Sequence, residues 1–345
     1  MEYGAIDLHM RRSEIRIERE DGTVVFAQRV DTTRSSFARV FAGRARMRIL
    51  IESSTESEWV AQCLETMGHE VIVADPNYAP MYGQRNRRVK TDTRDVTALT
   101  AACRTGTYRL ASRVSAAQRT RRQELRVRRH LVRMRTHTIS LLRTLVRQEG
   151  LRIPRGSSEQ ILARLDRVEI PEPLAVVLTP LREALTALQA TLDGIEERME
   201  TLASTDATVQ RLMTAPGVGP IVALTYLAVL DTPTRFGGDA RRASAFLGLV
   251  PSEDSSGERR HKGRITKMGP PELRSLLIQA AWVIWRGRSA EGAALRAWAH
   301  ALAARRGRRI AIVALARRLS RILFAMWRDH TAFKNRAHVA PAAAA

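Results

Sequence analysis

Apolar residues recur at alternating steps of four and three between positions 174 and 202, and this spacing constrains the fold more than any other feature. The series comprises Leu174, Leu178, Leu181, Leu185, Leu188, Leu192, Ile195, Met199 and Leu202. A 3.5-residue period places these side chains in one seam along a helix, which Pro180 interrupts near its start. The seam predicts a coiled coil, either within the chain or between subunits. The alternative is a long amphipathic helix that packs on its own domain.

The first hundred residues alternate between strand and helix patterns. Short apolar or alternating runs predict strands at residues 3–8, 14–19, 23–30, 47–52 and 70–74. Helices are expected at residues 35–42, from a cap at Ser54 or Thr55 to Gly68, and at residues 91–104. This order of three strands, helix, strand, helix, strand, helix is that of a ribonuclease H-like domain. Fold order alone does not establish an activity.

The charge balance predicts a polyanionic partner. Lysine and arginine number 57 against 35 aspartates and glutamates, a formal net charge of +22. Basic surfaces bind nucleic acid by releasing the counterions of its phosphates, so DNA is the expected partner. No apolar run is long enough to span a bilayer and the first residues do not form a signal peptide, so we expect a cytoplasmic, nucleoid-associated protein without a membrane partner. Cys63 and Cys103 lack metal-ligand spacing and are expected to be buried, reduced thiols.

Arginines concentrate in two places. Residues 118–147 are helical in pattern and contain one acid, Glu124. A run that is almost wholly positive repels itself, which favours a bound phosphate backbone over a merely solvated face. The candidate nucleic-acid contacts are Arg121, Arg122, Arg126 and Arg129, together with the later cluster Arg305, Arg306, Arg308 and Arg309.

Four carboxylates occupy positions that would meet in a ribonuclease H-like sheet. Asp7 and Glu52 end predicted strands, while Asp92 and Asp95 share one face at the start of a predicted helix. Clustered carboxylates repel one another, and a divalent cation removes that penalty. Two Mg²⁺ ions about 3.5–4 Å apart, for which Mn²⁺ can substitute, would stabilise both oxygens of a phosphodiester under attack. The alternative is that these acids are only caps and surface residues.

A polar, glycine-punctuated segment at residues 248–270 lies between apolar helices. Ser255 and Ser256 are candidate nucleophiles, because a neighbouring cation or metal could stabilise a serine alkoxide. The segment's cationic residues are Arg259, Arg260, Lys262, Arg264 and Lys267. A flexible loop that only touches the DNA backbone explains the same residues equally well. The turn at residues 216–219 fits either a phosphate-binding helix–hairpin–helix or a plain helix–helix turn.

The chain resembles the DEDD-type insertion-sequence transposases, the "IS one-ten" group that includes the Piv/MooV DNA invertases. The resemblance covers almost the whole chain and rests on the motifs ID (6–7), IES (51–53), KTDTRD (90–95), APGVG (215–219), FLGLVP (246–251), SSG (255–257), RITKMG (264–269) and LRSLL (273–277). It implies that Asp7, Glu52, Asp92 and Asp95 form a metal-binding acidic tetrad and that Ser256 is the nucleophile. It also implies a structured noncoding guide RNA that pairs with donor and target DNA, and a homo-oligomer, either dimer or tetramer.

We therefore expect an α/β plus all-α architecture. A RuvC-like (ribonuclease H-like) domain at residues 1–112 would precede basic coiled-coil helices at 113–205. A mostly helical C-terminal transposase domain with the serine motif would occupy 206–335, before a disordered tail at 336–345. The predicted activity is RNA-guided, metal-dependent DNA cleavage and strand exchange through a covalent phosphoserine. The alternatives are a RuvC-like structure-specific nuclease that only hydrolyses DNA, and a non-catalytic nucleic-acid-binding scaffold.

Overall fold

The computed structural model describes residues 1–83, 92–256 and 259–335, except for the side chains of residues 254–262. The chain divides into two compact units, Met1–Arg113 and Val114–Ala345, and each has hydrophobic clusters of its own. The expected disordered tail at 336–345 lies outside the described residues.

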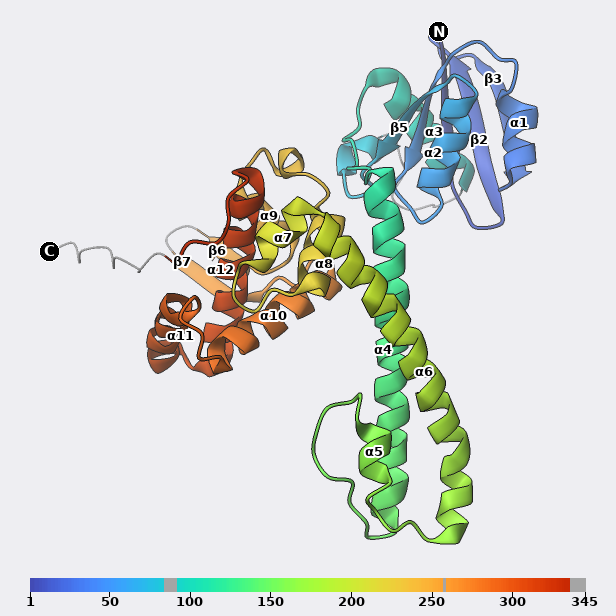
Figure 1. Cartoon of the computed structure of the whole chain (residues 1–345). Coiled ribbons are helices and arrows are strands. Elements are labelled where there is room, and N and C mark those ends of the chain that lie inside the picture. The colour runs from blue at the N-terminus through green and yellow to red at the C-terminus, as the bar shows by residue number, and fades with distance from the viewer. Residues whose placement is uncertain (84–91, 257–258, 336–345) are drawn as a thin grey trace, which may run out of the picture. The chain divides into compact units, whose positions relative to one another are not determined.

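The first unit is a five-stranded mixed sheet with helices on both faces (Figure 1). Its elements are β1 (Glu2–Asp7), β2 (Arg12–Arg19), β3 (Val24–Asp31), α1 (Arg34–Phe41), β4 (Arg48–Glu52), α2 (Ser57–Thr66), β5 (Glu70–Ala74), the 3₁₀ turn η1 (Ala79–Tyr82) and α3 (Asp92–Thr105). The strand order is β3-β2-β1-β4-β5. The first three strands are antiparallel, whereas β1, β4 and β5 run parallel. This arrangement agrees with the ribonuclease H-like order expected from the sequence.

The alternation of side chains along the strands builds two cores, one on each face of the sheet. Ile6 and Ile51 face a cluster formed with α1 and α2, while Ala5 and Leu50 face a second cluster formed with α3. All four side chains are fully buried. Both faces of the parallel strands are therefore covered, as expected for strands joined by helical crossovers.

The expected elements of this unit are present, with ends that differ by one or two residues. One cap was predicted wrongly: α2 begins after Glu56, and neither Ser54 nor Thr55 is its N-cap. The Ser57 hydroxyl instead donates to the Ser54 carbonyl and accepts from the Ser54 backbone N–H, so the serines stabilise the turn that precedes the helix. Cys63 and Cys103 are buried free thiols, as predicted.

The second unit is mainly helical. Its elements are α4 (Ala116–Gln148), α5 (Ile161–Leu165), α6 (Glu172–Thr205), α7 (Ala207–Met213), α8 (Pro220–Leu230), η2 (Pro233–Phe236), α9 (Ala240–Phe246), β6 (Pro251–Ser256), β7 (Arg259–Ile265), α10 (Pro271–Arg286), α11 (Ala293–Arg306) and α12 (Arg308–Arg328). Its main core surrounds α8, in which every residue from Ala223 to Leu230 is buried. No helix in the described parts of the chain combines the length and apolar character needed to cross a membrane.

The leucine seam lies on α6 and packs against α4 of the same chain, as the two long helices in Figure 1 run side by side. Leu178 and Leu185 contact the cluster that contains Ile139 and Leu142 of α4. The helix continues through Pro180, where the sequence suggested an interruption. Proline removes one backbone hydrogen bond, and the buried contacts of the leucines on either side outweigh this local loss.

The serine segment forms a β-hairpin, although the sequence suggested a loop. Strands β6 and β7 pair antiparallel, with an irregularity between Pro251 and Glu253. Backbone hydrogen bonds pair the two strands. Because their sequence is mostly polar, it lacks the alternation of apolar and polar residues that predicts a strand. Gly269 follows the hairpin at φ +88°, where a Cβ would overlap the Phe246 carbonyl oxygen. The packing of the chain on itself therefore explains this glycine.

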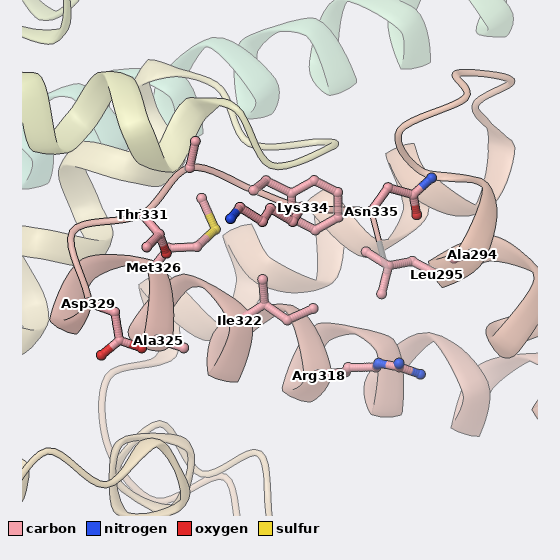
Figure 2. Close-up of a pocket in the computed structure, with 12 residues that line it drawn as sticks. Ala294, Leu295, Arg318, Ile322, Ala325, Met326, Asp329, Thr331, Lys334 and Asn335 are labelled. Atoms are coloured by element: carbon pink, nitrogen blue, oxygen red, sulfur yellow. The ribbon is translucent and has the colours of Figure 1, made fainter. Parts of the chain in front are cut away.

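The C-terminal end of the described chain folds back over α12. The Phe333 backbone N–H donates to Thr214 Oγ1 at 2.8 Å, and Asn335 Nδ2 donates to the Ala290 carbonyl at 3.0 Å. Phe333, Asn335 and residues of α12 line a pocket of about 450 Å³, and Figure 2 shows Ile322 and Met326 of α12 among its side chains. Its lining is largely apolar, so this contact holds the last described residues on the second unit.

Candidate active site

Two of the predicted acids meet because the strands that carry them are parallel neighbours. Ile6 of β1 lies in register with Ile51 of β4, and each of these buried residues is followed by a carboxylate, Asp7 or Glu52. The carboxyl ends of parallel strands lie at the same edge of a sheet. Asp7 and Glu52 therefore come to the same edge although 45 positions separate them in the sequence.

The other two acids come from the first turn of α3, which packs against β1. Asp92 and Asp95 are three residues apart and so lie on one face of the helix. Asp95 is 7% exposed, whereas the Asp92 side chain is 42% exposed. Acidic side chains interact favourably with the N-terminal end of a helix dipole, which partly offsets their mutual repulsion.

The three other acids all affect the pKa of Asp7. Burial is the largest cause that raises the pKa of Asp7 above its ordinary value, and the nearby His9 opposes the rise. The negative charges of Glu52, Asp95 and Asp92 raise this pKa further. The structure thus brings Asp7 and Asp92 within ligand distance of each other, and places Glu52 and Asp95 near enough for their charges to act on Asp7.

Three neighbours of the acids were not predicted. His9 Nε2 lies 3.4 Å from Asp7 Oδ2 and 3.9 Å from Asp92 Oδ1. Arg29 Nη2 lies 3.5 Å from Asp92 Oδ2. The Tyr82 hydroxyl donates a hydrogen bond to Glu52 Oε1.

Of these three neighbours, only His9 could have been predicted from the sequence. His9 stands two positions after Asp7, a spacing that keeps two side chains on one side of an extended chain. Arg29 shares a cross-strand line with Asp7, because Asp7 pairs with Glu14 and Glu14 pairs with Arg29. That line depends on strand register, which the sequence alone did not fix.

The donor set fits a hard divalent cation. One ligand atom each from Asp7, His9 and Asp92 lie within 4.8 Å of one another. Carboxylate oxygens are the ligands that Mg²⁺ and Mn²⁺ prefer, and imidazole is also a ligand for transition metals. Burial, and then the charges of the three other acids, raise the pKa of Asp7 although His9 opposes the rise, so a bound cation would favour the ionised carboxylate.

The predicted nucleophile lies on the β6–β7 hairpin of the second unit. The backbone of Ser256 ends β6 and pairs with Arg259, and Ser255 pairs with Arg260. The side chains of Ser255, Ser256, Arg259, Arg260 and Lys262 lie outside the described residues. Arg264 and Lys267 are exposed, and Lys267 has a positive φ of 57°.

The predicted contact arginines of α4 lie in two different environments. Arg122, Arg126 and Arg129 line a pocket of about 520 Å³, whereas Arg121 lies 3.5 Å from Asp206. Burial and the neighbouring Arg126 lower the pKa of Arg122. The guanidinium group of Arg129 lies 3.5 Å from Glu272, so one acid offsets part of the positive charge of this pocket.

The later arginine cluster surrounds the junction between α11 and α12. Arg305 and Arg306 end α11, and Arg308 and Arg309 begin α12. All four are exposed, and the first turn of α12 contains no acid. Cations at a helix N-terminus oppose the helix dipole, so this end of α12 favours an external anion.

The Pro216–Gly219 turn joins α7 to α8 and has a clear packing role. Gly217 has φ +74°, and a Cβ on it would lie 2.7 Å from the Ala280 carbonyl oxygen of α10. This close approach explains the glycine as a helix–helix packing residue, which is the plainer of the two interpretations of the motif.

Comparisons with known proteins identify the family of the chain. A transposase family model of the DEDD type matches residues 5–150, and the model described as "Transposase IS116/IS110/IS902 family" matches residues 209–295. A "Probable family 20 transposase" of Pseudomonas aeruginosa is 30% identical over 292 residues, which cover 83% of this chain and 85% of the relative.

Two insertion-sequence proteins are similar over still more of the chain. The "Transposase for insertion sequence element IS1111A" of Coxiella burnetii is 27% identical over 89% of this chain and 84% of its own length. The "Transposase for insertion sequence element IS1328" of Yersinia enterocolitica is 26% identical over 96% and 98%, respectively. Matches of this extent, together with an acidic cluster at one sheet edge, show that the chain belongs to the IS110 family of transposases, enzymes that cut and rejoin DNA.

Proposed function

We propose that this transposase cleaves DNA strands at the edge of the sheet where Asp7, Glu52, Asp92 and Asp95 meet, with Mg²⁺ or Mn²⁺ held by these acids. The observation that carries the proposal is the group of Asp7, His9 and Asp92, whose ligand atoms lie within 4.8 Å of one another, with Glu52 and Asp95 near enough for their charges to act on Asp7. Such an arrangement is costly without a cation. When bound, divalent ions would stabilise the charge that develops on the attacked phosphodiester.

The chain's own residues would position the acids for this task. The Tyr82 hydroxyl holds one oxygen of Glu52 and leaves the other oxygen available as a ligand. Arg29 contacts Asp92 at the exposed side of the site, where it can also attract a phosphate. His9 lies between Asp7 and Asp92 and can either ligate a cation or limit the repulsion of the two acids.

The test is cleavage of a plasmid that carries the element ends, with Asp7→Asn and Asp95→Asn. Each variant should lose cleavage by about 100-fold or more, because it removes an anionic ligand while preserving shape. Asp21→Asn is the matched control: it makes the same chemical change in an exposed hairpin turn, where Asn-Gly is also favourable. Undiminished cleavage by Asp7→Asn would contradict the proposed site.

We further propose that Ser256 is the nucleophile of strand transfer. Its hydroxyl would lose its proton and form a phosphoester bond with a DNA phosphorus, and the displaced strand would leave as a hydroxyl. Attack by that or another strand end would reverse the step and release serine. Support comes from the resemblance of the SSG motif and from the cationic residues of the same hairpin, Arg264 among them.

A covalent protein–DNA adduct distinguishes this chemistry from hydrolysis by water at the acidic site, the alternative that the acids by themselves favour. Denaturation during the reaction should trap labelled DNA on the protein, and Ser256→Ala should abolish the adduct. Ser255→Ala is the control, since it removes the neighbouring hydroxyl. Cleavage without any trapped DNA in the wild-type protein would favour the hydrolytic mechanism.

The remaining proposals concern partners. We propose that an element-encoded RNA guides the reaction, that the chain acts as a homo-oligomer, and that nucleic-acid backbone contacts Arg122, Arg126 and Arg129. Their support is the resemblance and the poorly compensated charge of the α4 pocket. Purification followed by selective DNase or RNase digestion identifies the bound nucleic acid, and light scattering gives the oligomer. A protein that recombines DNA after complete removal of RNA would contradict the guide.

A further inference from the structure

A strongly basic pocket of about 800 Å³ lies in the second unit, beside α9, α11 and α12. It is separate from the acidic site and was not suggested by the sequence patterns. One aromatic residue, Trp298, and one acid, Asp239, contribute to its lining. Its cationic residues are Arg241, Arg317, Arg318, Arg321 and Arg328.

The acids near this pocket already have partners. Asp239 caps α9 by accepting from the Arg241 backbone N–H at 2.7 Å. Asp329 binds Arg328 through two contacts of 2.7 and 2.8 Å. Neither acid is among the groups whose charges act on Arg317 or Arg318.

Three arginines on α12 have no acidic partner among the residues that the structure describes. Within the described parts of the chain, no carboxylate forms an ion pair with Arg317, Arg318 or Arg321. Nε of Arg317 is buried and has no hydrogen-bond partner. Arg317 and Arg321 stand one helical turn apart, a spacing at which like charges destabilise a helix. Burial and the charge of Arg321 lower the pKa of Arg317, and burial lowers that of Arg318.

The same pocket contains an aromatic ring with an arginine over it. The Arg318 guanidinium carbon lies 4.6 Å from the ring centroid of the half-buried Trp298. Ile322 and Ala325, which Figure 2 shows with Arg318 on α12, provide an apolar wall to the same pocket. Nucleobases stack on aromatic rings and on arginine planes, while their phosphates require nearby cations.

We propose that this pocket binds a nucleotide whose base is unpaired, with its phosphate held by Arg317 and Arg321 and its base stacked on the Trp298–Arg318 pair. Bases within a duplex are stacked on one another and cannot reach such a surface. Single-stranded DNA and single-stranded RNA share the required chemistry. The inference rests on the proposal that the chain acts on nucleic acid, and it does not depend on the acidic site.

The test measures binding alone, with the full chain in EDTA so that metal-dependent cleavage does not contribute. Fluorescence anisotropy compares labelled single-stranded DNA of about 12 nucleotides, RNA of the same sequence, and the DNA duplex. Trp298→Leu should weaken binding of at least one single strand by about five- to tenfold, and that of the duplex by less than about twofold. Arg317→Gln and Arg321→Gln should each reduce the slope of log affinity against log salt by about 0.7.

Arg198→Gln is the matched control. It removes the same charge from an exposed position on α6, where Glu197 and Glu200 are its neighbours, and should leave the slope unchanged. Thermal unfolding checks that the pocket variants fold; Arg317→Gln should be at least as stable as the wild type, because it relieves a like-charge repulsion. Whichever strand loses affinity, DNA or RNA, identifies the source of the nucleotide.

Two results would overturn the inference. Folded Arg317→Gln, Arg321→Gln and Trp298→Leu proteins that bind single strands with wild-type affinity and salt slope would show that the pocket does not bind nucleic acid. An equal loss of duplex and single-strand binding would show a surface for duplex backbone without recognition of an unpaired base.

Discussion

Replacement of Asp7 by asparagine should stabilise the metal-free protein, although it removes a residue proposed to be essential. Asp7 is largely buried and interacts unfavourably with three carboxylates. One like-charge pair at the 4.8 Å separation that bounds this cluster costs about 3 kcal/mol at an effective dielectric constant of about 20. The 42% exposure of Asp92 and the neighbouring His9 and Arg29 side chains reduce this value, so we expect a net gain of about 1 kcal/mol.

Differential scanning fluorimetry measures the effect directly. In EDTA, a gain of about 1 kcal/mol should raise the Tm of a unit of this size by about 4 °C or more. In Mn²⁺ or Mg²⁺ the order should reverse, because a cation that binds only the folded wild-type site stabilises it, and Asp7→Asn should lose most of that gain.

The opposite behaviour would refute the electrostatic reasoning. A Tm that falls in EDTA would indicate that Asp7 is a structural residue whose contacts stabilise the fold. An undiminished metal-induced rise in Asp7→Asn would indicate that the cation binds elsewhere. Asp21→Asn, which leaves the cluster intact, should show the full wild-type response to metal.

Three further predictions concern the rest of the chain. Gly217→Ala should destabilise the second unit by about 2–3 kcal/mol in urea unfolding, since it adds a Cβ 2.7 Å from the Ala280 carbonyl at φ +74°; a change below about 0.5 kcal/mol would contradict the close approach. Hydrogen bonds, chiefly from the Asn77 backbone and from Arg109, lower the pKa of Asp75, so Asp75→Ala should cost about 1 kcal/mol above pH 4. That cost should disappear as the pH falls through the lowered pKa, and unfolding curves measured at pH 7 and pH 3 test the sign. Burial raises the pKa of Cys103 to about 12, so this thiol should react with a disulfide reagent at pH 8 only after unfolding.

The sequence by itself determined the elements whose signals are local. The alternating strands of the first unit, its helix order and the long apolar seam of α6 each follow from the period of side chains along one segment. The four acids could also be proposed from the sequence, because Asp7 and Glu52 stand at the ends of apolar strands and Asp92 and Asp95 share one face at the start of a helix. The family resemblance extended this to the serine motif.

Only the tertiary structure decided which distant groups meet and which charges remain uncompensated. Strand pairing placed Asp7 beside Glu52 and, two strands away, brought Arg29 to Asp92. The β6–β7 hairpin was not predicted, because strands can pair through their backbones without a pattern of apolar side chains. Arg317 became unusual only because the fold buries its Nε near Arg321, with no ion pair to an acid among the described residues. Electrostatic energies depend on distance and burial in space, and a single sequence encodes these only through the fold.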